Sequence, residues 1–567
     1  MKKPQQGQPP RYMGSRYLPI ALCVAGLAIG GEAMATASLP ATNAIAWDTC
    51  APGFVDERWR VALGHRLQCG SMHAVLDEDA PDGRTFTVGI VRVKAGDPAR
   101  RKGSIFFNFG GPGGNPLDYL PPMAYLWTIL DLDHPLDGDK RRLADGYDLV
   151  AVVPRGMRGG TRITCHGLPE ARPSEDPTFF LADFNWARIV QAARTYANGC
   201  TEDPLQRHAG TLQHVRDMEQ VRRALGEPAM NFVGVSYGSW VGAFYAAAYP
   251  GHTGRIVLDS VMNYAGTFQD QIEDASYDNQ WRFAWRALRP ALGQPHRYGI
   301  GTDAKAVMRQ FNAMPILAGA SWAPVIDAPS HLVAALVMAE WVRAEWNTTA
   351  DRLVARANAH VFSADHGAHE EIKQAALELA ERYDQARDET LGGLVDLAVF
   401  HAVVCGDTPW RKDIHAMRAL AQDIGSRYPA AGGRGVRLSL VCANWTNGPR
   451  WRPPVYALSL APPMLMVQAE FDPSTSLDGA MKAFNASANA YLVVAKGMTG
   501  HGIFGSSATP CVEQGVSRYL LTGKLPDSAL SYCDFVPAPP VRESREAHDG
   551  PSESEARAEF ARLIRAS

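Results

Sequence analysis

The chain has 567 residues, 46% of them hydrophobic, and a formal net charge of −3. This length exceeds one ordinary domain, although large α/β cores with insertions reach it. The hydrophobic content is sufficient for an extensive buried core. The near-neutral charge gives no electrostatic case for binding nucleic acid, so we expect no nucleic-acid partner.

Residues 1–37 have the features of a signal peptide. Four basic residues precede the apolar stretch 18–30, which is too short to span a bilayer comfortably, and small-x-small cleavage motifs occur within 33–37. An uncleaved anchor is the alternative. We therefore expect an exported protein, periplasmic or extracellular, with no stable membrane span once the signal is removed.

Eight cysteines remain after this leader, and an even number in an exported chain suggests disulfides. Sequence alone allows many connectivities. We predict pairing between neighbours in the chain, because each pair would close a local loop. No Cys-x-x-Cys motif occurs, so we expect neither a thiol redox site nor a zinc knuckle. The predicted pairs are Cys50 with Cys69, Cys165 with Cys200, Cys405 with Cys442, and Cys511 with Cys533.

Strands and helices alternate in the first half of the chain. Residues 38–84 are expected to form an N-terminal extension with turns. Helices are predicted at 212–225 and 237–249, from apolar stripes that glycine or proline ends. The alternation predicts an α/β fold with a doubly wound, mostly parallel sheet. The predicted strands are 86–93, 104–109, 148–153, 230–235 and 255–261.

Helical patterns dominate from 263 to 453. The clearest helical segments are 330–347 and 370–404, and the second is long enough for more than one helix. We interpret this region as an inserted helical cap. Strands resume at 463–468 and 491–495.

Ser236 lies in a Gly-x-Ser-x-Gly motif between a predicted strand and a helix of small residues. This context is typical of a tight turn that projects a nucleophilic hydroxyl above the sheet. The motif alone is a weak signal, and a buried serine in a glycine-rich turn is the alternative. The strand before it and the helix after it favour the nucleophile.

A nucleophilic serine needs a base, and the base needs an orienting acid. In doubly wound hydrolases these residues follow in the order serine, acid, histidine, each after a strand. Asp472 and His501 occupy these positions after the last two predicted strands. We therefore predict Ser236, Asp472 and His501 as catalytic residues, with Glu470 and Asp259 as alternatives for the acid.

The glycine-rich turn at 110–114 is the expected source of one oxyanion donor. Backbone N–H groups fixed beside the reacting carbonyl stabilise the charge of a tetrahedral intermediate. We predict the Gly111 amide, with Gly110 as the alternative, and the Tyr237 amide after the nucleophile. A flexible connector is the other interpretation. A phosphate-binding loop is less favoured because the Lys-Ser/Thr signature is missing.

These motifs resemble the tripeptidyl aminopeptidase branch of the prolyl aminopeptidase (S33) family. The resemblance covers about 45–535 and is densest at 104–116, the elbow, 221–226 and the Asp472/His501 block. It implies an exported α/β-hydrolase with a helical cap, acting at free peptide N-termini, although relatives include carboxylesterases. The organisation then reads as a signal peptide at 1–37, the first part of the hydrolase core at 38–262, the cap at 263–453, the C-terminal part of the core at 454–535, and a polar, mobile tail at 536–567 with a helix near 553–564.

The chain departs from this family after the third strand. Relatives usually have an Asp-Pro-Arg-Gly-x-Gly turn, whereas Val153 replaces the aspartate here and Arg158 replaces a glycine. The change leaves the predicted catalytic residues untouched. It puts the local loop, and with it the shape of the substrate site, in question.

An aminopeptidase must also bind a substrate ammonium, and a desolvated cation needs acidic or carbonyl partners. Acidic residues of the predicted cap are candidates, although a solvated helix face or a structural acid is the alternative for each. The candidates are Asp270, Glu273, Asp274, Asp278 and Asp407.

The sequence therefore predicts a serine hydrolase that needs no metal or cofactor, with a peptide or small ester substrate. Our first hypothesis is an aminopeptidase that releases short peptides or single residues. A carboxylesterase or lipase-like enzyme with the same catalytic residues is the alternative. A non-catalytic binding protein is a third interpretation.

Overall fold

The computed structural model describes residues 44–166, 176–178, 180–345, 347–387, 396–427, 433–505, 509–536 and 550–566. They belong to one compact unit, Thr42–Ser567. The predicted signal peptide lies outside the described residues, as do residues 537–549 of the predicted tail. Within the described ranges, no helix combines the length and apolarity needed to cross a membrane.

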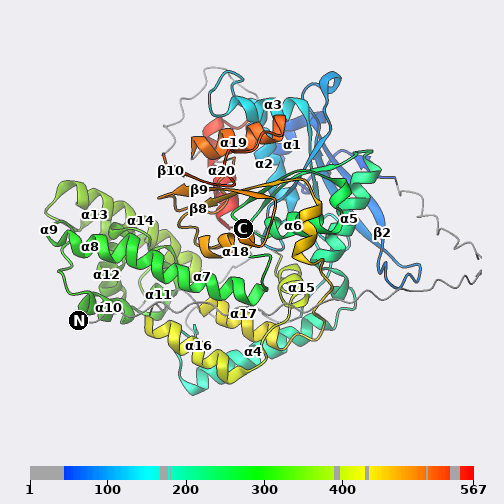
Figure 1. The fold of residues 1–567 in the computed structure, drawn as a ribbon. Helices are drawn as coiled ribbons and strands as arrows, with labels where there is room; N and C mark the ends of the chain where they lie inside the picture. The colour runs from blue at the N-terminus through cyan, green and yellow to red at the C-terminus, as the bar shows by residue number, and fades with distance from the viewer. Residues whose placement is uncertain are drawn as a thin grey trace, which may run out of the picture. The chain divides into compact units, whose positions relative to one another are not determined.

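Ten strands of the described chain form one sheet, in the order β1-β2-β3-β5-β4-β6-β7-β8-β9-β10 (Figure 1). The strands from β5 to β10 pair in parallel, and β1, β2 and β3 add an antiparallel edge. The sheet is thus mostly parallel, as predicted. The strands are β1 (Ala46–Asp48), β2 (Leu67–Val75), β3 (Thr85–Val93), β4 (Ser104–Asn108), β5 (Asp148–Val152), β6 (Met230–Val235), β7 (Thr253–Asp259), β8 (Met464–Ala469), β9 (Ala490–Lys496) and β10 (Leu530–Asp534).

The expected N-terminal extension with turns is in part wrong, because this region supplies β1, β2 and the helix α1 (Glu57–Leu63). The strand β2 has glycine, serine and histidine in place of a clear apolar alternation, so its own pattern is weak. All nine of its residues nevertheless pair with β3. Tertiary pairing, rather than local preference, makes this segment a strand.

Helices of the hydrolase core form two groups that pack on the sheet. The helix α3 contacts both α2 and α19, and α5 contacts α6. Because both groups bury apolar side chains, strands such as β4, β5 and β8 are buried along their whole length. The core helices are α2 (Pro116–Ile129), α3 (Gly138–Gly146), α5 (Thr211–Ala224), α6 (Tyr237–Ala248), α18 (Leu477–Asn485) and α19 (Pro510–Thr522).

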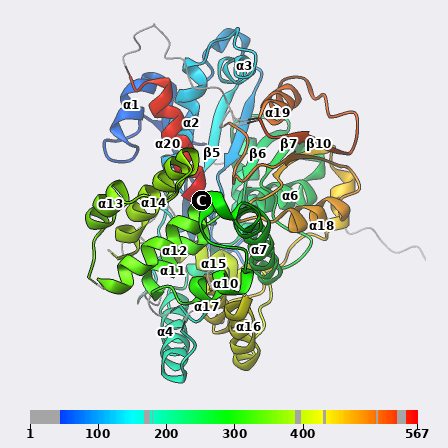
Figure 2. The same ribbon diagram turned by 90° about the vertical axis from the view of Figure 1, so that its left-hand side faces the viewer.

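The helical region after β7 contains two groups with different hydrophobic cores. Helices between Phe283 and Tyr383 enclose a cluster of their own and gather together in Figures 1 and 2. The helices α15 to α17 instead contribute to the main core cluster. The helices are α7 (Phe268–Phe283), α8 (Arg289–Gly293), α9 (Pro295–Tyr298), α10 (Ala304–Asn312), α11 (Ile316–Trp322), α12 (Pro329–Ala344), α13 (Ala350–Ala359), α14 (His366–Arg387), α15 (Leu397–Asp407), α16 (Ile414–Arg427) and α17 (Gly433–Ala443).

One further helix, α4 (Asp183–Thr201), lies between β5 and α5 in the chain but packs on α17. This helix is not among the predicted elements. Its buried face includes Trp186, Ile189 and Tyr196, which belong to the main core cluster.

All four disulfides join the predicted partners: Cys50–Cys69, Cys165–Cys200, Cys405–Cys442 and Cys511–Cys533. The first links the segment just after β1 to β2, the third links α15 to α17, and the fourth links α19 to β10. Four disulfides fit a protein exported to an oxidising compartment.

The structure differs from the expected mobile tail over its last residues. The predicted terminal helix forms as α20 (Glu553–Ala566) and packs on α2, which it accompanies in Figure 2. Four apolar side chains at helical spacing explain the packing, because each is almost fully buried. They are Ala556, Phe560, Leu563 and Ile564.

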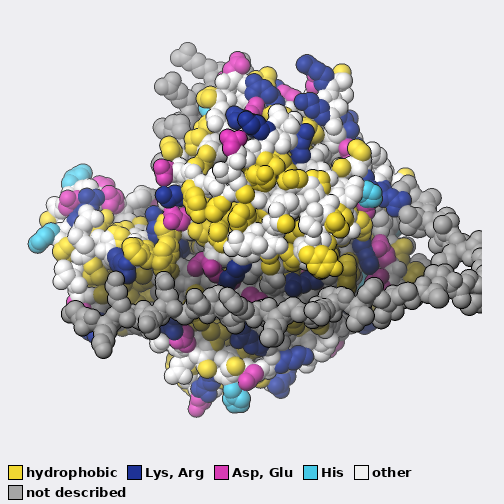
Figure 3. Space-filling view, viewed as in Figure 1, with side chains coloured by type: hydrophobic (Ala, Val, Ile, Leu, Met, Phe, Trp, Pro, Cys, Tyr) yellow, Lys and Arg dark blue, Asp and Glu magenta, His cyan; other side chains and the backbone are white. Residues whose placement is uncertain are grey.

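Charged side chains of both signs are interspersed on the face shown in Figure 3, together with patches of hydrophobic side chains. This mixture agrees with the small net charge of −3. Exposed apolar side chains include Tyr456 and Leu460, in the segment that precedes β8.

Candidate active site

Ser236 stands in a strained turn between β6 and α6. Its φ of 59° and ψ of −123° are rare for a residue with a side chain. Only glycine fits at positions 234 and 238, because a side chain at either position would collide with the backbone. A β-carbon at Gly234 would collide with the Gly238 carbonyl, and one at Gly238 would collide with the Asn108 carbonyl. The turn therefore has the geometry of a nucleophile elbow.

Asp472 and His501 meet on the loops that follow β8 and β9. The Nδ1 atom of His501 lies 2.9 and 3.0 Å from the two carboxylate oxygens of Asp472. Asp472 also accepts hydrogen bonds from the amides of Ser474 at 2.8 Å and Thr475 at 2.9 Å. The carboxylate is therefore oriented by the backbone before it orients the imidazole.

The electrostatics of this pair are those of an orienting acid and a base. Burial alone would lower the pKa of His501, but the charge and hydrogen bond of Asp472 raise it above its ordinary value. Burial alone would raise the pKa of Asp472, but His501 and the two backbone amides hold it below its usual range. Asp472 therefore stays ionised and stabilises the imidazolium form of His501.

The other ring nitrogen of His501 is available for proton transfer. Its Nε2 atom is buried and has no hydrogen-bond partner among the described residues. The next residue, Gly502, lies beside the strand that carries the nucleophile, since a β-carbon there would approach Val235 Cγ1 to 3.1 Å. The His501 loop and the Ser236 turn are thus neighbours, although they are far apart in the chain.

The glycine-rich turn after β4 packs directly against the elbow. A β-carbon at Gly110 would lie 2.8 Å from Ser236 Cβ and 3.3 Å from the Tyr237 nitrogen. The Gly110 amide donates a hydrogen bond to Asn108 Oδ1 at 3.0 Å, so it already has an acceptor within the loop. This favours Gly111 over Gly110 as the oxyanion donor of the turn.

Asn108 is oriented by a histidine that the sequence analysis does not single out. Its Nδ2 atom lies 3.1 Å from His214 Nε2. Burial lowers the pKa of His214 to about 3, so the ring is neutral at physiological pH and accepts this hydrogen bond. The only sequence signal is a histidine on the buried stripe of a helix, which is more often a core residue.

The two alternative acids have other partners. Asp259 accepts hydrogen bonds from the amides of Ile503 at 3.0 Å and Phe504 at 2.8 Å. Burial raises the pKa of Asp259 to about 7. Glu470 accepts from the Gly497 amide at 2.7 Å. Asp472 is therefore the carboxylate that binds His501.

The turn that departs from the family pattern contacts α2 and the residue before it. The Arg158 side chain forms an ion pair with Asp118 of α2. The backbone carbonyl of Arg158 accepts a hydrogen bond from Asn115 Nδ2 at 2.9 Å. Asn115 in turn caps the first turn of α2, which follows the glycine-rich turn. Arg158 thus supports the entry to α2 rather than the predicted catalytic residues directly.

Four of the five predicted ammonium ligands are occupied by partners within the chain. Asp270 caps α7 together with Thr267. The other three form ion pairs with basic side chains. These pairs are Glu273 with Arg411 at 2.9 Å, Asp274 with Lys482 at 2.8 Å, and Asp407 with Arg450 at 3.0 Å.

Asp278 differs because it lines a cavity that Asp472 also lines. The cavity has a volume of about 550 Å³ and lies between α7, α18 and the loop after β8. Burial raises the pKa of Asp278, which weakens its charge unless a cation binds. Phe471 of the same loop stacks on Trp281 of α7, with ring centroids 5.4 Å apart.

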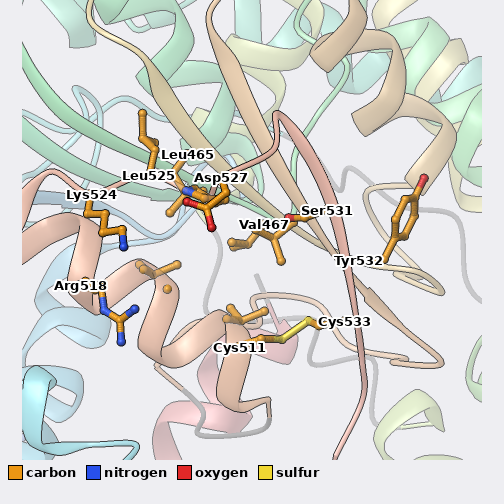
Figure 4. Close-up of a pocket in the computed structure, with 15 residues that line it drawn as sticks. Leu465, Val467, Cys511, Arg518, Lys524, Leu525, Asp527, Ser531, Tyr532 and Cys533 are labelled. Carbon is orange, nitrogen blue, oxygen red and sulfur yellow. A yellow bond between two sulfur atoms is a disulfide. The ribbon is translucent and has the colours of Figure 1, made fainter.

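A second cavity, of about 260 Å³, lies between α19, β8, β9 and β10 beside the Cys511–Cys533 disulfide (Figure 4). Arg518, Lys524 and Asp527 contribute polar groups to its rim. None of the predicted catalytic or ammonium-binding residues lines it.

The parallel sheet, the serine elbow and the acid–histidine pair together define an α/β-hydrolase of the serine hydrolase class. Family comparison agrees, because residues 109–296 match the family described as "alpha/beta hydrolase fold". Residues 428–549 match the family described as "TAP-like protein". The chain has the α/β-hydrolase fold and is a serine hydrolase.

Among curated proteins, the chain is similar to tripeptidyl aminopeptidase of Streptomyces lividans, with 27% identity over 516 residues and 87% coverage of both chains. It is also similar to serine protease Hip1 of Mycobacterium tuberculosis, with 26% identity, over 34% of this chain and 36% of that protein. A solved structure of proline iminopeptidase from Mycobacterium smegmatis matches with 12% identity and a TM-score of 0.33, over 80% of this chain and 97% of that chain.

Proposed function

We propose that this protein is an exported aminopeptidase that releases short peptides or single residues from free peptide N-termini. The observation that carries the proposal is the buried hydrogen bond between Asp472 and His501, beside the Ser236 elbow. The similarity to tripeptidyl aminopeptidase over 87% of both chains supports a peptide substrate.

In the proposed reaction, Ser236 Oγ attacks the carbonyl carbon of the scissile peptide bond. His501 Nε2 takes the hydroxyl proton and later donates it to the leaving amine. Asp472 holds the imidazole and stabilises its positive charge. The amides of Gly111 and Tyr237 donate to the oxyanion, and each such donor typically contributes about 3 kcal/mol to the transition state. Water then attacks the acyl-enzyme through the same base and releases the N-terminal fragment.

We assign the substrate ammonium to Asp278. The side chain lines the cavity beside Asp472, and its partners there are the Ser476 side chain and the Asp478 backbone. The other four predicted acids cap α7 or pair with a basic side chain. Trp281 and Phe471 border the same cavity, where their rings stack on each other and Arg286 lies over the Phe471 ring. A charged amino terminus would also offset the cost of burying the Asp278 carboxylate.

Ester hydrolysis is the competing activity, because the elbow and the acid–histidine pair do not distinguish an amide from an ester. One peptide panel with free and N-acetylated termini, assayed beside short acyl esters, separates the two activities. We expect cleavage of the free peptides that is lost on acetylation. Activity on esters alone would overturn the aminopeptidase proposal.

For location we propose a periplasmic or extracellular protein. The basic and apolar leader at 1–37 and the four disulfides support export. N-terminal sequencing of the mature protein, recovered from separate periplasmic and culture fractions, tests both cleavage near residue 37 and the compartment. Recovery from the cytoplasm with Met1 intact would contradict the proposal.

A further inference from the structure

The C-terminal helix α20 packs onto the turn that follows His501. A β-carbon at Gly505 would approach Phe560 Cε1 to 3.1 Å. At Gly502, a β-carbon would collide with Cγ2 of Ile564. The helix therefore touches the backbone of the residue next to the predicted base.

This turn is also held by buried carboxylates. Asp259 binds the amides of Ile503 and Phe504, and Glu513 accepts from the Gly505 amide at 3.1 Å. These bonds restrain the turn toward the sheet. The side chains of α20 contact the same turn, so hydrogen bonds and apolar packing both restrain it.

A chain of ion pairs connects α20 to the same turn. Arg557 pairs with Asp137 at 2.7 Å, Asp137 with Lys140 at 2.6 Å, and Lys140 with Glu513 at 2.8 Å. Glu513 is the residue that binds Gly505. The side chains of Asp137, Lys140 and Glu513 are almost fully buried, so their opposite charges must compensate one another. The helix is therefore anchored to the core as well as to the turn.

The role of α20 is separate from what the family matches describe. These matches cover residues 109–296 and 428–549, whereas α20 spans Glu553–Ala566. The helix is thus a feature of this chain beyond the matched segments.

We propose that α20 is a positioning element of the active site, and that Ile564 acts through the His501 turn to hold the imidazole against Ser236. This inference rests on the proposed catalytic role of His501. The relevant atom is Cγ2 of Ile564, which limits outward movement of Gly502. A displacement of about 1 Å at a reacting group can lower a rate about 100-fold, so a small shift of the turn is sufficient.

Two substitutions of similar size in the full-length protein isolate this atom. Ile564→Val keeps Cγ2, and we expect it to retain at least about half of the wild-type kcat. Ile564→Leu keeps the side-chain volume but lacks Cγ2, and we expect kcat to fall about 10-fold with KM changed less than about twofold. The acid limb of its pH–rate profile should move to lower pH, because a displaced imidazole loses part of its contact with Asp472.

Leu563→Ala and Ile564→Ala provide the matched control for stability. The two side chains are neighbours on α20 and are 2% and 3% exposed. Both substitutions should lower the melting temperature to a similar extent, since each removes a buried aliphatic group. Only Ile564→Ala should also lower kcat and shift the pH profile.

Equal losses of kcat for Leu563→Ala and Ile564→Ala would show that α20 is only structural. A wild-type kcat and pH profile for Ile564→Leu would overturn the role of Cγ2. Labelling of the wild-type protein by a fluorophosphonate at Ser236 tests the proposed function separately. An unlabelled wild-type protein would reject that function whatever the α20 variants do.

Discussion

The site beside the sheet and the cavity beside α7 are built in contrasting ways. Ser236, Asp472 and His501 are buried, and backbone groups fix the turns that carry them. Trp281 on α7 and Trp285 just after it are 47% and 48% exposed, and the acids of α7 mostly form ion pairs near the surface. The contrast indicates that the chemistry is preorganised by the core, whereas substrate choice depends on side chains that tolerate change.

Removal of the nucleophile should have the largest effect on the buried site. Ser236→Ala should lower kcat on the order of 10⁶-fold, because the remaining acid and base then have no hydroxyl to activate. Peptide hydrolysis and fluorophosphonate labelling measure this loss. A variant that keeps substantial activity would refute the assignment of Ser236.

Asp472→Asn tests the orienting acid. The amide has nearly the same shape but no charge, so kcat should fall about 10⁴-fold while the fold is retained. Circular dichroism checks the fold. Asp259→Asn is the comparison variant, since Asp259 holds the turn without touching the imidazole. If Asp259→Asn is the more damaging change, the roles of the two acids are reversed.

Asp278→Asn tests the proposed ligand of the substrate ammonium. Loss of a charged hydrogen bond to the substrate ammonium should raise KM for free peptides about 10- to 100-fold with little change in kcat. Glu273→Gln, whose partner is Arg411, is the matched control and should leave KM near the wild-type value. Equal effects of both variants would remove Asp278 as the ammonium ligand.

The smallest expected effect is a shift in pH dependence. Only neutral His501 acts as a base, and its pKa is raised, so kcat/KM should rise with pH through a midpoint above the ordinary value of about 6.5. The midpoint should fall in Asp472→Asn, because the charge that raises the pKa is gone. Asp278→Asn should leave the midpoint unchanged. A midpoint unaffected by Asp472→Asn would contradict the electrostatic role of that carboxylate.

Much of the core could be predicted from the sequence because parallel strands are apolar and elbow motifs are local. Every predicted strand is present, and the structure brings together Asp472 and His501 as predicted. The strands β1, β2 and β10 and the helix α4 are not among the predicted elements. The strand β2 has a weak pattern of its own, although its partner β3 is the next strand, whereas α4 packs on α17, which is distant in the chain.

The tail shows where the sequence was not sufficient. The apolar spacing from Ala556 to Ile564 indicates a helix, but nothing in that spacing reveals that α2 and the His501 turn provide its partner surface. The polar, proline-rich residues before it favoured mobility instead. The same limitation applies to His214, whose role depends on Asn108 more than a hundred positions earlier.

The order of the strands has a consequence for synthesis. The nucleophile follows β6, whereas its acid and base follow β8 and β9, after the whole helical insertion has been made. A growing chain that stops before residue 490 therefore carries a serine without its histidine. Such fragments should be chemically inert, so neither an interrupted translation product nor a chain still in transit can cleave the peptides around it.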